Sequence, residues 1–232
     1  MAQVPAPSEA ALRAHLAFLA DDVLEGRGTG QRGGDLAVRY LETQLQVLGL
    51  QPANGTSYRQ KVHLAGLRLD AAASRLNFVG PKGSLSPELG NDLALGAAAP
   101  EPQVVVDAPL VFVGHGIAAS DGSRDDYKGL DVRGRILVML VGDRPGGPPS
   151  PLCCESENLY GRWTYKFEEA KRHGAAGVLL VHTNRSAGYG WAVVRNSWTQ
   201  ERFQREGAGQ PGAVQGWLTE ASATRLDRKS VV

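Results

Sequence analysis

The chain has 232 residues, with 25 Lys and Arg against 24 Asp and Glu, so its formal net charge is +1. This balance argues against a nucleic-acid-binding surface, which normally shows a clustered basic excess. Hydrophobic residues make up 42% of the sequence, which excludes a disordered chain. No run approaches about eighteen consecutive apolar residues, so no membrane-spanning helix is expected.

The first part of the chain, residues 8–69, is expected to be mainly helical. Leucines at helical spacing predict a helix that begins after Ser8, which can cap the free amides, and reaches Val23. A second predicted helix runs from about Gly34 to Leu48. Alternating apolar residues then predict a strand over Tyr58–Leu69.

The sequence pattern changes near Asp70 from predicted helices to short strand candidates, and we place a domain boundary there. From there, short strand candidates separated by Gly, Pro and Asp turns occur at Arg75–Val79, Val104–Val106, Pro109–Val113 and Arg135–Val141. The last of these is apolar on both faces, which is typical of a central strand. A helix at Trp163–His173 followed by a buried strand at Gly177–Val181 predicts a βαβ crossover, and hence a mixed α/β fold.

Two glycine-rich runs resemble nucleotide-binding loops but lack the required context. Gly28–Gly33 has the G-x-G-x-x-G spacing, yet a helix rather than a strand precedes it, so we interpret it as a loop. Gly142–Gly147 follows a strand but has no Gly-Lys-Ser/Thr after it, which argues against a phosphate site.

Acidic clusters are interpreted as solvated surface. The Asp121–Asp126 loop lacks the central Gly and distal Glu of a calcium loop, so a solvated turn is expected, with an adventitious calcium site as the alternative. Glu168 and Glu169 lie on a predicted helix beside Lys166, Lys171 and Arg172, where ion pairs along an exposed face explain them better than catalysis does.

No nucleophile or metal pair can be identified from spacing. The adjacent Cys153 and Cys154 have neither disulfide-framework nor zinc-site spacing and are interpreted as loop thiols. There is no G-x-S-x-G elbow, and no histidine stands in H-x-D, H-x-H or H-E-x-x-H spacing. The histidines are therefore expected to pack in the core or on the surface: His15, His63, His115, His173 and His182.

Several segments resemble known proteins. His15–Gly30, followed by the helix ending at Leu48–Pro52, is similar to the amino-terminal helices of secreted di-zinc aminopeptidases of metallopeptidase family 28. Later segments resemble the protease-associated (PA) domain inserted in a subset of that family. They are Val111–Ile117, Asp126–Val138, Tyr160–Ala170, Gly174–His182 and Ala187–Trp198.

The resemblance implies that residues 8–69 are the amino-terminal part of a peptidase domain, with its helices and edge strand. It implies that residues 70–226 are a PA domain. Family members hold two zinc ions through His, Asp and Glu, and a Glu acts as general base. Those residues follow the PA domain, in a segment that opens with H-x-D, which this chain lacks. No catalytic, cofactor-binding or metal residue is therefore expected here, and Glu168 and Glu169 are not the family's glutamate pair.

The end of the sequence carries a further expectation. A helical pattern covers Trp217–Leu226, and residues 227–232 are interpreted as a non-native tail such as an adapter-encoded read-through. The chain would then be an amino-terminal fragment in which residues 8–69 lack their covering sheet. We expect an exposed apolar face prone to self-association and an unpaired strand edge at Tyr58–Leu69.

Two functions remain open. In the first, the chain is part of a zinc-dependent aminopeptidase that acts on peptides or proteins and is inactive as given. In the second, it is a non-catalytic PA module that binds protein or peptide. No signal peptide is seen at residues 1–7, although their Ala/Pro/Gln composition hints at a secreted or periplasmic parent.

Overall fold

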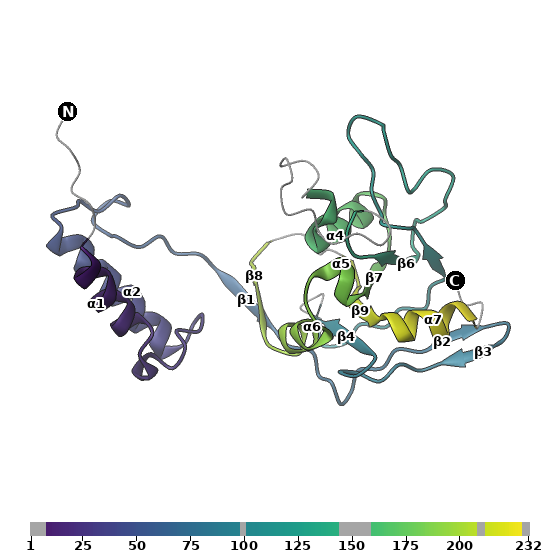
Figure 1. Cartoon of the computed structure of the whole chain (residues 1–232), viewed down its shortest axis with the longest axis horizontal. Coiled ribbons are helices and arrows are strands. Elements are labelled where there is room, and N and C mark those ends of the chain that lie inside the picture. Colours follow the sequence, from purple (N-terminus) through teal and green to yellow (C-terminus); the bar gives the residue numbers. More distant parts are fainter. Residues whose placement is uncertain (1–7, 98–100, 144–158, 208–211, 229–232) are drawn as a thin grey trace. The chain divides into compact units, whose positions relative to one another are not determined.

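The computed structural model describes residues 8–97, 101–143, 159–207 and 212–228. The chain divides into two compact units, which we call the helical unit (Met1–Val62) and the sheet unit (His63–Val232). The fold is mixed α/β, as predicted, with helices in the first unit and a mixed sheet with helices in the second (Figure 1). In the described part of the chain, no helix is both long and apolar enough to cross a bilayer.

The helical unit contains the two predicted helices. Its elements are α1 (Glu9–Leu19), the 3-10 turn η1 (Asp22–Leu24) and α2 (Arg32–Val47). Ser8 caps α1 as expected, because its Oγ accepts a hydrogen bond of 3.5 Å from the Ala11 N–H. The first helix ends earlier than predicted, since Asp21 accepts from the Val23 N–H and starts a separate turn.

The two helices contact each other through one aromatic residue. Tyr40 on α2 lies 2.6 Å from His15 Nδ1, and Phe18 stacks on the same ring with centroids 4.4 Å apart. At the start of α2, Gly33 lies so close to the Leu24 carbonyl that a Cβ would clash with the backbone. A side chain there would push η1 away from α2.

Most of the apolar surface of the helical unit is exposed. Leu16 on α1 keeps 66% of its surface accessible, and Leu48 after α2 keeps 72%. Among the described residues of this unit, the buried hydrophobic side chains are Leu24 and Ala37. Further exposed members of this apolar face are Leu12, Leu36, Leu41, Val47 and Leu50.

The expected edge strand is shorter than predicted, and it is paired. Strand β1 (Leu64–Leu67) runs antiparallel to β8 (Arg202–Arg205), with Leu64 opposite Arg205. The prediction of an unpaired edge over Tyr58–Leu69 is therefore wrong, because the partner strand comes from much later in the chain. This pairing places residues 63–69 in the sheet unit, so the units divide a few residues before the expected boundary near Asp70.

The sheet unit is built on a five-stranded sheet with the order β4-β9-β7-β6-β5. Its strands are β4 (Leu93–Gly96), β5 (Leu110–Phe112), β6 (Ile136–Leu140), β7 (Gly177–His182) and β9 (Val214–Thr219). Strand β4 is antiparallel to β9, and the other pairs are parallel. Helix α4 (Trp163–Arg172) lies between β6 and β7 in the chain, which confirms the predicted βαβ crossover.

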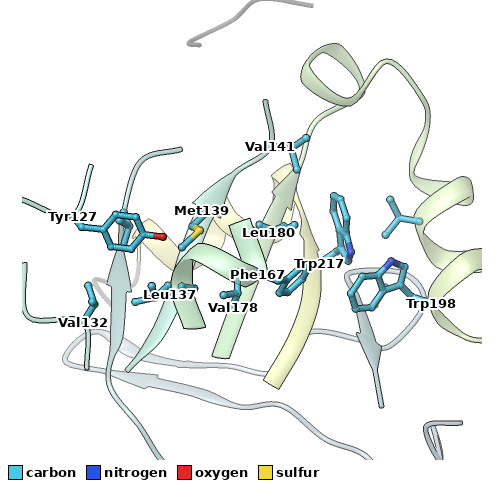
Figure 2. Close-up of a cluster of buried hydrophobic side chains, with 14 residues drawn as sticks. Tyr127, Val132, Leu137, Met139, Val141, Phe167, Val178, Leu180, Trp198 and Trp217 are labelled. Carbon is cyan, nitrogen blue, oxygen red and sulfur yellow. The ribbon is translucent and has the colours of Figure 1, made fainter. Parts of the chain in front are cut away.

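One face of the sheet packs against helices. Leu137 and Met139 of β6 and Trp217 of β9 lie in one buried cluster with Phe167 of α4 and Trp198 of α6 (Figure 2). Helix α6 comprises Trp191–Trp198 and follows the short helix α5 (Asn184–Ala187). The Trp198 and Trp217 rings meet edge to face at 75°, with their centroids 5.9 Å apart.

The opposite face is covered by other elements. Ile136 and Val138 of β6 cluster with Phe78 and Leu85, which belong to the hairpin of β2 (Phe78–Gly80) and β3 (Gly83–Leu85). Leu226 of helix α7 (Glu220–Arg228) completes this second core. Alternate residues of β6 thus enter different cores, which confirms that Arg135–Val141 contains a central strand.

Two predictions in the sheet unit are wrong. Val104–Val106 is not a strand, and the helical pattern predicted from Trp217 begins only at Glu220. In β9, Trp217 enters one core and Leu218 enters the other, so burial on both faces overrides the local helical pattern.

The exposed apolar face leads to a test of self-association. We expect Leu16→Lys with Leu48→Lys to weaken association of the chain at least about tenfold, because burying a leucine contributes roughly 1.5–3 kcal/mol. Light scattering coupled to size-exclusion chromatography at several concentrations measures this. The matched control, Ala14→Lys with Gln46→Lys, adds the same charges at exposed positions. Equal association of the two variants would show that this face is not the contact.

Candidate functional site

Polar side chains gather where the parallel strands of the sheet unit end. The carboxyl ends of β5, β6, β7 and β9 lie at one edge because these strands are parallel. The loops that leave this edge carry the turn after Val113, the turn at Gly142 and the α5 segment. In open α/β sheets, this edge is where ligands usually bind.

A buried lysine connects these loops. Lys166 lies on the inner side of α4 with no accessible surface. Its Nζ donates to the carbonyl oxygens of His115 at 2.5 Å, Gly142 at 2.8 Å and Tyr160 at 3.2 Å. One ammonium group therefore ties the turn after β5, the end of β6 and the segment before α4 to a single point.

The charge of this lysine is costly to bury. Burial, together with the nearby positive charge of Arg124, lowers the pKa of Lys166 to about 7, and Asp126 and Asp143 partly oppose that shift. The three carbonyl acceptors use all the donors of the ammonium form. The side chain is thus a structural connection, and no proton of it is left for a ligand.

Asp126 organises the turn on the other side of the lysine. Its carboxylate receives two hydrogen bonds from the Arg124 guanidinium, at 2.8 and 2.9 Å, and one from each of the backbone N–H groups of His115 and Ile117, at 3.1 Å. Burial raises the pKa of Asp126, but these donors outweigh it and hold the pKa below its usual range. The carboxylate is therefore charged and occupied by protein donors.

His115 is held in one tautomer. Its Nδ1 lies 3.2 Å from the Gly142 carbonyl, which can only accept, so Nδ1 carries the proton and Nε2 is an acceptor. Burial, then the charges of Lys166 and Arg124, lower the pKa of His115, so the ring is neutral at pH 7. Nε2 is buried and has no hydrogen-bond partner among the residues that the structure describes.

His182, at the end of β7, is fixed in the same way. Its Nε2 lies 3.0 Å from the Tyr189 carbonyl and therefore donates to it. The ring meets Trp191 edge to face, with centroids 5.7 Å apart. Burial lowers the pKa of His182, which keeps this ring neutral as well.

His115 and His182 line an open pocket of about 690 Å³. The ends of the strands supply other parts of its wall, with Leu140 from β6, Val141 directly after it and Thr219 from β9. The exposed side chains of Arg185 and Glu220 also line it. A pocket of this size, with apolar walls and a few fixed polar groups, has the character of a small-molecule site.

The glycine-rich runs do not form nucleotide sites in the described part of the chain. A helix and a 3-10 turn precede Gly28–Gly33, and Gly33 serves the close packing on η1. The Gly142 carbonyl accepts from Lys166 and His115. Residues 144–147 lie outside the described residues, as do Cys153 and Cys154.

The carboxylates of the acidic loop are occupied by the protein itself. Asp121 Oδ1 accepts from both the N–H and the hydroxyl of Ser123, at 3.0 and 2.6 Å. Asp125 Oδ1 accepts from the Tyr127 N–H at 3.0 Å, and Asp126 binds Arg124. The loop is therefore closed by its own hydrogen bonds, which favours the interpretation as a turn over a calcium site.

The predicted solvated face of α4 is only partly correct. Glu168 is exposed and lies 3.8 Å from Arg172. Glu169 is buried, where it pairs with Arg172 and His173. Lys166, expected among the exposed ion pairs, is fully buried. Its spacing from the apolar residues Trp163, three positions before it, and Ala170, four positions after it, is the signal that could have placed it on the inner face of the helix.

The described residues do not fit a zinc centre. No three His, Cys, Asp or Glu side chains of this part of the chain come together as metal ligands. No step of metal-assisted hydrolysis can be assigned to these side chains.

Comparisons with known proteins give distant matches. No protein-family model and no curated protein matches the sequence. Among solved structures, the chain is similar to an aminopeptidase from Aneurinibacillus sp. strain AM-1, with 17% identity and a TM-score of 0.41, over 95% of this chain and 40% of that one.

Two structures of BSAP, a zinc aminopeptidase from Bacillus subtilis, also match. The first has 14% identity and a TM-score of 0.35, over 93% of this chain and 40% of that one. The second has 13% identity and a TM-score of 0.37, over 93% of this chain and 41% of that one. The chain thus spans about two fifths of the length of the solved chains that it matches.

The connection through Lys166 can be tested by removing it. We expect Lys166→Met to lower the free energy of unfolding of the sheet unit by about 3 kcal/mol, because the carbonyls of His115 and Tyr160 lose this donor and that of Gly142 keeps only His115, at roughly 1–3 kcal/mol for each lost donor, partly offset by the removal of a buried charge. Urea unfolding followed by tryptophan fluorescence measures it. Lys171→Met on the exposed side of the same helix is the control, and equal stabilities of the two variants would refute the connection.

Proposed function

We propose that this chain is the amino-terminal and PA-domain portion of a zinc-dependent aminopeptidase of metallopeptidase family 28, which removes amino-terminal residues from peptides. In this proposal, the two-zinc catalytic segment belongs to sequence beyond these residues, and this portion alone is inactive. The parent enzyme would be secreted or periplasmic. The apolar face of the helical unit is the observation that carries the proposal.

This face needs a covering element that the helical unit does not contain. Leu16, Leu41 and Leu48 each expose half or more of their surface. Helices as short as α1 are marginal in water and gain most of their stability by packing an apolar side. A peptidase domain whose remaining sheet lies against α1 and α2 would supply that packing.

The sheet unit gives separate support. His115, Asp126 and Lys166 belong to three different segments that resemble the PA domain. They meet in one hydrogen-bonded cluster, in which Lys166 donates to the His115 carbonyl and Asp126 accepts from the His115 N–H. Three segments that lie far apart in the sequence thus form one hydrogen-bonded cluster, as expected if they belong to one domain type.

A non-catalytic PA module that binds protein or peptide is the second candidate. It is favoured by the sheet unit's buried clusters on both faces of its sheet and by the pocket at the carboxyl edge. The two candidates differ in what the gene encodes after this portion.

The gene sequence after the codon for Leu226 tests the proposal most simply. We expect an open frame that encodes an H-x-D motif followed by further carboxylates for two zinc ions. As a second measurement, the chain itself is incubated with zinc and an aminoacyl-nitroanilide, and no hydrolysis is expected. A genuine stop codon without such a segment would favour the binding module, and turnover that a chelator abolishes would contradict the claim that this portion is inactive.

A further inference from the structure

We propose that the pocket at the carboxyl ends of β6, β7 and β9 binds a free α-amino acid with an apolar side chain. The pocket measures about 690 Å³ and lies wholly within the sheet unit. Such a volume accommodates a small molecule together with ordered water. This inference does not depend on the peptidase proposal, because it uses the chemistry of the pocket alone.

The apolar wall of the pocket is already held in place. Trp191 Nε1 donates to the Gly90 carbonyl at 2.9 Å, which fixes the indole. His182 packs edge to face on that ring and is anchored by the Tyr189 carbonyl. Leu140 and the buried Val141 add aliphatic surface. A preorganised wall reduces the entropy lost on binding, so it favours a small apolar side chain as ligand.

A buried acceptor at this pocket lacks a donor. His115 is 5% exposed and lines the pocket, and its Nε2 has no hydrogen-bond partner in the described part of the chain. Buried polar atoms without partners are uncommon and costly. Since Nδ1 carries the proton, Nε2 can be satisfied only by an N–H or O–H group. Neighbouring atoms cover Nε2 in this structure, so a ligand reaches it only if the side chains around it move.

Among the described residues that line the pocket, one carries a positive charge and one a negative charge. Arg185 and Glu220 both line it, both are exposed, and neither forms an ion pair within the described ranges. A carboxylate and a neutral histidine acceptor that line the same pocket suit an ammonium group, and a guanidinium suits a carboxylate. A simple cation or anion would use only half of this arrangement, whereas an amino acid uses both halves.

Calorimetric titration of the full chain tests the proposal with four probes. L-leucine has both charged groups, N-acetyl-L-leucine lacks the ammonium, L-leucinamide lacks the carboxylate, and leucyl-glycine separates the two charges. We expect leucine to bind and the other three to bind at least about tenfold more weakly. No leucine binding at about 20 mM would overturn the proposal. Equal binding of either blocked analogue, or tighter binding of the dipeptide, would also overturn it.

Variants then locate the binding site. We expect Glu220→Gln and Arg185→Gln each to weaken leucine binding at least about tenfold. The matched controls, Glu206→Gln and Arg205→Gln, lie at exposed positions outside the pocket lining and should leave binding unchanged. All four positions are exposed, so folding is not at risk. Binding that is unchanged in both pocket variants would place the amino acid elsewhere and contradict the assignment.

Discussion

The ammonium group of Lys166 is the constraint on which the carboxyl edge of the sheet depends. It joins carbonyls at His115, Gly142 and Tyr160, three points that are far apart in the sequence. Removing such a group from water costs several kcal/mol, and only good acceptors on every side offset that cost. The loops after β5 and β6 therefore have one shared anchor, and the position of α4 is fixed by the same contacts.

The same anchor helps to fix the residues that line the candidate ligand pocket. The Gly142 carbonyl accepts from both Lys166 and His115, so the lysine helps to hold in place the carbonyl that fixes the tautomer of the imidazole. The buried clusters on both faces of the sheet hold the edge rigid. The helical unit differs, because its apolar side chains are mostly exposed. The proposed amino-acid site thus lies in the sheet unit, whereas the peptidase proposal depends chiefly on the exposed apolar surface of α1 and α2.

Local sequence patterns predicted the helices and strands whose burial can be inferred from neighbouring residues. Every residue after Arg135 in the run Arg135–Val141 is apolar, so both faces of a strand there are apolar, and the strand within this run is indeed central. Strand β9 was not predicted because Trp217 and Leu218 are buried in two different cores, whose other residues lie far away in the sequence. Partners of β1 and of Lys166 could not be predicted either, since strand pairing across the chain and backbone carbonyl acceptors leave no signature in side-chain spacing. The pocket was missed for the same reason.

A direct test of this account is the titration of Lys166 by nuclear magnetic resonance. The Cε signal of each lysine can be followed with pH in the intact chain, and Lys166→Arg identifies the signal that disappears. Burial lowers the pKa of Lys166, so the account predicts a midpoint of about 7. An exposed lysine titrates near 10.4. A Lys166 midpoint in that ordinary range would contradict the burial of this amine away from water, which is the cause of the lowered pKa.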